Sequence, residues 1–358
     1  MGKLDKINRI VVKTLITWPI CLTENAIDEI LIKDIYDDEG NLLIGRNAII
    51  NEYVLNILEK SKIKQVPIYP TKEDDHLVPY IDLSLGHKEN ILTMKKIATR
   101  LVAGKGVNSN ILGSISKNLS IEVNDSQMIG ETDRIRDTDE YTYNHSINVA
   151  IYSAYIGKLI RLDKERINEL CQAALLHDIG KSKVPKDILN KKGRLTEEEF
   201  KVVKKHTIDG YILSKGLSFL KEEVREAILN HHEREDGSGY PRGIKGREIN
   251  LYGKILAIAD VYDALTSERV YKKKSTPFDA IEEFHKMGIH KFSIPLLKIF
   301  FKNISQFYVN SKVRLSDGMV GIIQFVHPEN ITKPIIKVQD KNINLSKNES
   351  LKIEEIIG

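Results

Sequence analysis

The sequence predicts a mainly α protein, in which a helical bundle is flanked by a small N-terminal α+β unit and a small C-terminal β tail. In the middle of the chain, apolar residues recur every three or four positions, which is the period of an amphipathic helix. After residue 307 they alternate with polar residues instead, as in VRLSDGMVGIIQFV, which is typical of strands. At 358 residues, the chain is long enough for more than one domain.

The helical periodicity predicts where the helices lie and how the chain divides into domains. Helices are expected at residues 91–101, 144–160, 164–176, 197–214, 221–231, 252–267 and 277–287. Thr196, followed three residues later by Glu199, forms a capping-box pattern that marks the start of one of them. We therefore expect four parts: an α+β domain at 1–72, a linker with helices at 73–138, a helical catalytic domain at 139–305, and a β-rich tail at 306–358.

Composition excludes several classes of protein. The 54 basic and 50 acidic residues are too balanced to indicate binding to a nucleic acid polymer. Cys21 and Cys171 are far apart, which favours neither a disulfide framework nor a thiolate zinc site. No apolar stretch approaches the roughly 20 residues of a membrane span, and the first residues lack a signal-peptide core. We expect a cytoplasmic protein without a membrane anchor.

The helical region carries a candidate metal centre. A single histidine on an apolar helix is more often a core residue with one hydrogen bond, but here five histidines and two aspartates fall within one ordered framework. Imidazole and carboxylate donors without thiolate suit iron, manganese or zinc. Seven donors exceed what one tetrahedral ion accepts, so two divalent ions are expected, and a binuclear centre suits hydrolysis of a phosphodiester. The seven are His145, His177, Asp178, His206, His231, His232 and Asp260.

Local context supports several of these candidates. The segment CQAALLHDIGK places His177 and Asp178 at the end of a helix, with Gly180 as its expected stop. Adjacent helical residues diverge by about 100°, so neighbouring ligands can address two ions or bridge them. Asp260 lies in the apolar run ILAIADVYDAL, where an unpaired carboxylate is costly to bury. Asp263 shares its helical face and is expected to orient a ligand histidine.

Three long motifs carry a resemblance to a known family. They are HDIGKSKVPKDILNKKGRLTEEEFKVVKKH, NHHEREDGSGYP and AIADVYDALTSERVYKK. Together they resemble the HD-GYP phosphodiesterases, a subset of the HD hydrolases that acts on cyclic di-GMP. The resemblance covers roughly residues 139–315 and implies an HD-type helical bundle.

The resemblance also implies roles for single residues. It assigns the seven candidates to the family's metal ligands, with Asp178 as the bridging, catalytic carboxylate. Lys181 matches the lysine that contacts the scissile phosphate, and Tyr240 matches the signature tyrosine near the substrate. Arg269 and Lys272 match basic residues that hold substrate phosphate and guanine. Two alternatives stay open: Lys181 as a cap of helix carbonyls, and Tyr240 as a packing aromatic.

The function that the resemblance implies is metal-dependent hydrolysis of cyclic di-GMP to linear pGpG, with a second round needed for GMP. One alternative is a binding module that senses the dinucleotide without turnover. Another is a hydrolase of a different cyclic dinucleotide or nucleotide, since a metal centre alone does not select the base. Besides the substrate, a signalling protein or a second copy of the chain is the expected partner.

One departure from the family pattern generates a prediction about metal count. Family members with three metals carry a glutamate four residues before the first histidine, where this chain has Tyr141. Glu140 is one residue out of register, which on a helix turns it about 100° away. Because a phenol with a pKa of about 10 is a poor ligand at neutral pH, metal analysis should find two ions per chain.

The same departure predicts the product. With two ions rather than three, less positive charge holds the new terminal phosphate, so pGpG should dissociate before a second cut and be the main product in a chromatographic time course. GMP accumulating without pGpG, or anomalous scattering from a third ion near Tyr141, would contradict this prediction.

Overall fold

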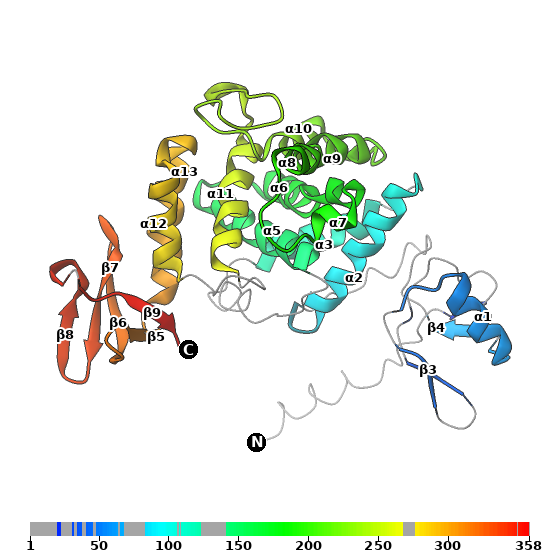
Figure 1. Cartoon of the computed structure of the whole chain (residues 1–358), viewed down its shortest axis with the longest axis horizontal. Coiled ribbons are helices and arrows are strands. Elements are labelled where there is room, and N and C mark those ends of the chain that lie inside the picture. The colour runs from blue at the N-terminus through cyan, green and yellow to red at the C-terminus, as the bar shows by residue number, and fades with distance from the viewer. Residues whose placement is uncertain are drawn as a thin grey trace, which may run out of the picture. The chain divides into compact units, whose positions relative to one another are not determined.

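The computed structural model describes residues 20–22, 31, 34–37, 41–45, 48–63, 65–67, 83–105, 107, 109–122, 141–267, 276–348 and 350–357 (Figure 1). The chain divides into two compact units, Met1–Pro79 and Tyr80–Gly358. Helices dominate the second unit, so the predicted mainly α class is confirmed. The finer boundaries at residues 72, 138 and 305 stay predictions.

The first unit is a small α+β fold, as expected. Its elements are β1 (Ile20–Leu22), β2 (Ile35–Tyr36), β3 (Leu42–Ile44), α1 (Glu52–Lys60) and β4 (Gln65–Pro67). The strands form two antiparallel pairs, β1 with β4 and β2 with β3. Asn51 caps α1, because its Oδ1 accepts a hydrogen bond from the backbone N–H of Val54 at 2.9 Å. Buried Val54 and Leu58 point α1 at the unit's own core.

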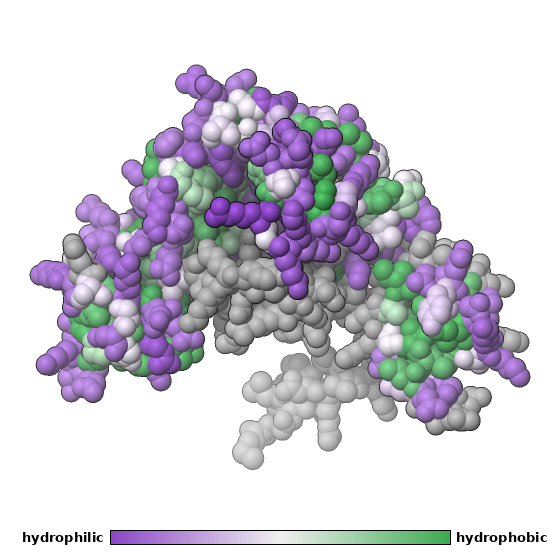
Figure 2. All heavy atoms as spheres, in the orientation of Figure 1, coloured by the Kyte–Doolittle hydropathy of each residue, from purple (hydrophilic) through white to green (hydrophobic). Residues whose placement is uncertain are grey.

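The second unit is built on helices that bury their apolar sides against one another. They are α2 (Leu83–Val102), α3 (Ser109–Glu122), α5 (Tyr141–Leu159), α6 (Lys164–Leu176), α7 (Lys186–Leu189), α8 (Glu197–Lys204), α9 (His206–Ser214), α10 (Glu222–Asn230), α11 (Leu251–Thr266), α12 (Pro277–Met287) and α13 (Ile294–Ile304). The 3₁₀ turns include η3 (Ile179–Lys183) and η5 (Ile289–Lys291). On the face in Figure 2, hydrophilic side chains prevail over these helices.

Two helices form the centre of this unit. Helix α5 packs along α6 and also contacts α11, while α6 contacts α3 and α10. Both central helices carry small, fully buried side chains, including Ala150, Ala154, Ala173 and Ala174, which allow close approach between helices. None of the described helices combines the length and the apolar character that crossing a bilayer needs.

The observed helices follow the predicted ones, with one correction. Residues 164–176 and 277–287 are helical as expected, and the capping box of Thr196 and Glu199 is present. The single helix predicted at 197–214 is wrong, because the structure divides it at Lys205 into α8 and α9. At this junction the carbonyls of Val203 and Lys204 accept side-chain hydrogen bonds, which compete with the helical ladder. Helices α3, α7 and α13 were not predicted.

The C-terminal residues form the expected β tail. It is a five-stranded antiparallel sheet in the order β8-β7-β6-β5-β9. The strands are β5 (Lys312–Leu315), β6 (Val320–His327), β7 (Asn330–Val338), β8 (Lys341–Asn344) and β9 (Ile353–Ile356). Val313 and Leu315 alternate inward and pack with Phe278 of α12, so the sheet shares a core with this helix.

Gly180 has a different role from the expected helix stop. Helix α6 already ends at Leu176, and Gly180 lies in η3, which packs against α9. A Cβ atom on Gly180 would overlap the carbonyl oxygen of His206 and lie 2.6 Å from the backbone nitrogen of Gly210. A residue without a side chain is therefore required where η3 meets the backbone of α9. This contact fixes the start of α9 close to the start of η3.

The close contact of η3 with α9 at Gly180 predicts that a single added methyl group lowers the stability of the fold. Gly180→Ala should separate η3 from α9 and lower stability by about 1–3 kcal/mol, the usual cost of overpacking. Gly113→Ala in α3 is the matched control, because a Cβ atom there has no described neighbour within 4 Å. Thermal unfolding should show a lower midpoint for Gly180→Ala alone, and equal midpoints for both variants would contradict the prediction.

Candidate metal centre

The structure brings all seven predicted metal-ligand candidates into one cluster. Three groups in it could hold a metal ion, because within each group one ligand atom per residue lies within 4.8 Å of the others. His177 and His231 each belong to two of the three groups, which makes the cluster continuous. The groups are His206, His231 and His232; His145, His177 and Asp260; and His177, Asp178 and His231.

Most of these side chains reach the cluster from helix ends. His177 is the C-cap of α6, Asp178 precedes η3, and His206 is the first residue of α9. His231 is the C-cap of α10, with His232 directly after it. The other two come from helix bodies: His145 from the early part of α5 and Asp260 from the middle of α11. A centre of this kind therefore depends on how several helices pack, rather than on one loop.

Hydrogen bonds at Nδ1 orient four of the five imidazoles. His177, His206 and His231 each place Nδ1 against the backbone carbonyl three residues earlier, at 2.6, 2.7 and 2.7 Å. His145 places Nδ1 2.6 Å from Oδ2 of Asp263. A neutral ring that donates from Nδ1 carries its lone pair on Nε2. These four rings thus offer Nε2 as a metal-binding atom.

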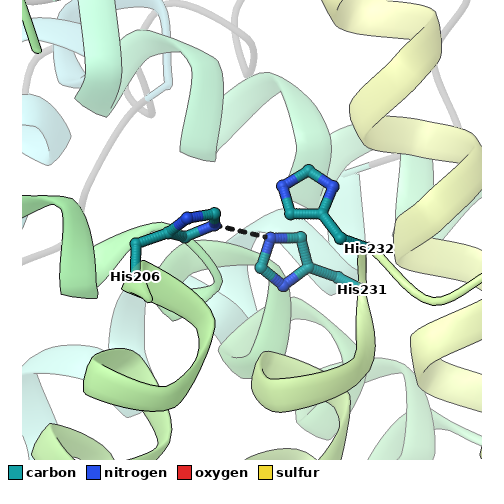
Figure 3. Close-up of side chains that lie close together, drawn as sticks. All are labelled: His206, His231 and His232. Atoms are coloured by element: carbon teal, nitrogen blue, oxygen red, sulfur yellow. Dashed lines mark hydrogen bonds between the residues drawn. The ribbon is translucent and has the colours of Figure 1, made fainter. Parts of the chain in front are cut away.

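The atoms that face inward fit a cation. Nε2 of His206 and Nε2 of His231 lie 3.3 Å apart, so two lone pairs face each other (Figure 3). Among the described residues, neither Nε2 of His177 nor Oδ1 of Asp178 has a hydrogen-bond partner, although both atoms are buried. Buried acceptors without a donor are costly, and a divalent ion satisfies several of them at once.

Burial keeps three of the histidines uncharged. It lowers the pKa of His206, lowers that of His231 well below its usual value, and lowers that of His232 to about 3. Neutral imidazole is the form that binds metal, so these rings are ready ligands at neutral pH. His145 differs: burial favours its neutral form, but hydrogen bonds with Asp260 and Asp263 outweigh burial and raise its pKa well above the usual value.

The two carboxylates stay charged inside the cluster. Burial alone would favour the protonated form of Asp178, but Lys181, His177 and His206 hold its pKa well below the usual range. Its Oδ2 lies 3.3 Å from Nε2 of His177, and its Oδ1 lies 3.4 Å from Nε2 of His206. The two oxygens thus face different imidazoles. The pKa of Asp260 is also well below its usual range, because a hydrogen bond with His145 outweighs burial.

Asp263 makes the contact that its position on α11 predicted. Besides binding His145, its carboxylate accepts hydrogen bonds from Nδ2 of Asn148 at 2.9 Å and from Oγ of Ser267 at 2.9 Å. Asp263 is almost fully buried, so these contacts leave the carboxylate little freedom to move. The orientation of the His145 ring is therefore fixed by a residue outside the candidate ligand set.

Two of the four predicted substrate-binding residues lie at the cluster. The Nζ of Lys181 is 2.5 Å from Oδ2 of Asp178, and about a quarter (26%) of the Lys181 side chain is exposed. The ring of Tyr240 lies 4.7 Å from that of His232. Arg269 and Lys272 lie outside the described residues, as does Glu140, and nothing is described of the side chain of Tyr141.

The loop after His232 depends on two residues that were not among the candidate site residues, Glu233 and the expected turn former Gly239. Glu233 is buried, and its Oε1 accepts hydrogen bonds from the backbone N–H groups of Arg242 and Gly243 at 2.7 and 3.1 Å. A Cβ atom on Gly239 would lie 2.5 Å from the carbonyl oxygen of His232, so this glycine is required for the fold of the loop. The only sequence signal for either was their place in NHHEREDGSGYP. Both residues hold Tyr240 next to His232.

Comparison with protein families identifies the segment that carries this cluster. Residues 121–293, which include all seven candidate ligands, match the family described as HD domain. The matched segment, which covers just under half of the chain, is therefore similar to HD domains.

Several curated proteins are similar to part of this chain. The cyclic di-GMP phosphodiesterase PA4108 of Pseudomonas aeruginosa is 37% identical over 57% of this chain and 49% of its own length. The cyclic di-GMP phosphodiesterase of Thermotoga maritima is 41% identical over 46% of this chain and 45% of its own. The 3'3'-cGAMP-specific phosphodiesterase 1 of Vibrio cholerae is 36% identical over 47% and 39%. The chain thus spans about half the length of these relatives, or less.

The contact between Asp263 and His145 predicts weaker metal binding when it is lost. Asp263→Ala should lower metal affinity about 10- to 100-fold, the usual effect of removing a residue that orients a ligand histidine. Asp187→Ala, which removes an exposed aspartate of α7 within residues 121–293, is the control. Competition with a chelator, followed by metal analysis, measures the difference, and equal retention of metal by the two variants would refute the role of Asp263.

Proposed function

We propose that this chain is a metal-dependent phosphodiesterase that hydrolyses cyclic di-GMP to linear pGpG. The observation that carries the proposal is the cluster of inward-facing Nε2 atoms and carboxylates in an HD domain. Its support is that curated relatives 37% and 41% identical over 57% and 46% of this chain are named cyclic di-GMP phosphodiesterases. Because the chain spans only about half the length of those relatives, its activity and substrate are proposed from the residues of the cluster.

In this proposal the seven clustered residues hold two divalent ions. Iron, manganese and zinc all accept imidazole and carboxylate donors. Asp178 is proposed as the bridging ligand, which suits its two oxygens because they face His177 and His206 separately. Ions held in this way supply Lewis-acid activation of the attacking water and neutralise charge on the phosphoryl oxygens.

The chain's own side chains then bind and orient the substrate. Lys181 is proposed to contact the scissile phosphate, because Asp178 holds its ammonium at the edge of the cluster while part of the side chain is exposed. A fixed cation at this place stabilises the negative charge that develops on the phosphoryl oxygens. Tyr240 is proposed to flank the substrate beside His232. Arg269 and Lys272 are proposed to bind substrate phosphate and guanine, as the family resemblance implies.

A second substrate has a specific observation in its favour. One relative, 36% identical over 47% of this chain, is named a 3'3'-cGAMP-specific phosphodiesterase. Cyclic dinucleotides share the phosphodiester at which the metal centre acts and differ in their bases, so product chromatography on both substrates separates the two candidates. A sensor that binds the dinucleotide without turnover would leave both intact. The cytoplasmic location, and a homodimer or signalling partner, stay predictions.

Two substitutions separate metal binding from chemistry. Asp178→Ala should lose both metal and hydrolysis, because it removes a ligand shared by the ions. Lys181→Ala should keep metal but lose about 10²-fold or more in rate, since it removes only charge stabilisation. Lys183→Ala, an exposed lysine of the same turn η3, should behave as the unaltered protein. The assay is cyclic di-GMP hydrolysis with metal analysis of each variant.

Two results would count against these assignments. Full activity in Asp178→Ala would remove the bridging role. Loss of metal in Lys181→Ala would make Lys181 a structural residue of the cluster.

A further inference from the structure

A cavity of about 440 Å³ opens beside the candidate metal centre. His232 and Tyr240 are part of its lining, so the cavity is continuous with the cluster. The rest of the lining includes Lys291 of η5, Phe292 and the end of α12. None of these residues outside the cluster has been used in the proposed reaction. The size and position of the cavity suit a further part of a substrate bound at the metals.

The charged side chains that line this cavity outside the cluster are all cationic. They are Arg234, Lys286 and Lys291, and no acidic residue is among the lining. Lys286 is paired with Glu283 at 2.7 Å. Within the part of the chain that the structure describes, neither Arg234 nor Lys291 has a carboxylate at ion-pair distance, although both are partly buried. Acidic groups act on both cations only from beyond ion-pair distance, Asp260 and Asp236 on Arg234 and Asp236 on Lys291. Because neither cation is directly paired, both can contact an anionic ligand in the cavity.

Arg234 is held in place before any ligand binds. Its Nη1 donates hydrogen bonds to the backbone carbonyls of His231 and Glu233, at 3.2 and 2.9 Å. Its Cζ lies 5.0 Å from the ring centroid of Phe292, which is a cation–π distance. A planar guanidinium fixed in this way loses little entropy on binding, and its fork matches the oxygens of a phosphate.

We propose that this cavity binds the second phosphodiester of a cyclic dinucleotide, the one that is not being cleaved, through Arg234 and Lys291. The inference rests on the proposed function. Both phosphodiesters of such a substrate belong to one closed ring, so fixing one at the metals presents the other to a neighbouring cavity. The cavity thereby selects cyclic dinucleotides over small phosphodiesters that carry a single phosphate.

The test compares two substrates that differ in this second phosphate. Lys291→Met removes the ammonium but keeps an apolar stem, and it leaves the backbone carbonyl that binds Glu235 in place. Its KM for cyclic di-GMP should rise about tenfold, as expected for the loss of one charged hydrogen bond. Its kcat/KM for bis(p-nitrophenyl) phosphate, which has no second phosphate, should stay unchanged. Lys286→Met should have a smaller effect, because Lys286 is paired with Glu283.

The matched control is Lys298→Met, which makes the same change at an exposed lysine of α13 outside the cavity. It should leave both substrates unaffected. An unchanged KM of Lys291→Met for cyclic di-GMP, or an equal loss on both substrates, would overturn the role of the cavity while hydrolysis by the unaltered chain upholds the proposed function. If the unaltered chain cleaves bis(p-nitrophenyl) phosphate but neither cyclic di-GMP nor 3'3'-cGAMP, the proposed function fails, and the cavity's role fails with it.

Discussion

The hydrogen bond from a ring Nδ1 to the carbonyl three residues earlier is the interaction on which the centre depends. It occurs at His177, His206 and His231, each near the end of a helix. The carbonyls near a helix end lack some of their helical partners, so an imidazole can occupy one without breaking a complete ladder. Each bond turns the other ring nitrogen inward. The imidazole at each of these helix ends is thus held with Nε2 in a fixed direction. The packing of the helices then determines which Nε2 atoms lie close together.

Two features of the packing bring the candidate ligands together: the close approach of η3 to α9 at Gly180, and the buried carboxylate of Asp263. Gly180 lets η3 touch the backbone of α9, which brings Asp178 and His206 together. Asp263 extends the same orientation to His145, whose Nδ1 has a carboxylate as partner instead of a carbonyl. The interior therefore contains groups that would be unfavourable singly, charged carboxylates and neutral imidazoles, in an arrangement where each limits the cost of the others.

The sequence allowed the mainly α class and the membership of the seven-residue cluster to be predicted, because both depend on local patterns, and the role of these residues as metal ligands stays a prediction. Donor residues at helix ends are visible in motifs such as HDIGK and NHHE, and periodicity reveals amphipathic helices. The role of Gly180 was missed because a helix stop and a close approach both require glycine, and only the neighbouring backbone distinguishes them. The division at Lys205 was missed because hydrogen bonds to two carbonyls there, at Val203 and Lys204, do not disturb the apolar spacing.

The cavity could not be predicted from local sequence patterns, for a different reason. Arg234 and Lys291 are residue types that are common on protein surfaces, and they are far apart in the chain. They line the same cavity only because the loop after α10 contacts η5. That contact includes the hydrogen bond from the backbone N–H of Glu235 to the carbonyl of Lys291. Long-range pairing of this kind leaves no periodic trace in either segment.

The loop after α10 has a consequence for how such a protein can change. One stretch of chain carries His231 and His232 at its start and Tyr240 near its end, and Glu233 fastens it by bonding the backbone beyond Tyr240. Two candidate metal ligands and a wall of the cavity are therefore held by the same segment of chain. A mutation that reshapes this wall to accept a different nucleotide also displaces two imidazoles. Under the proposed function, substrate preference and metal retention therefore change together through this loop. Substitutions in η5 and α12 can change the preference independently, because these elements contribute to the cavity but supply no candidate ligand.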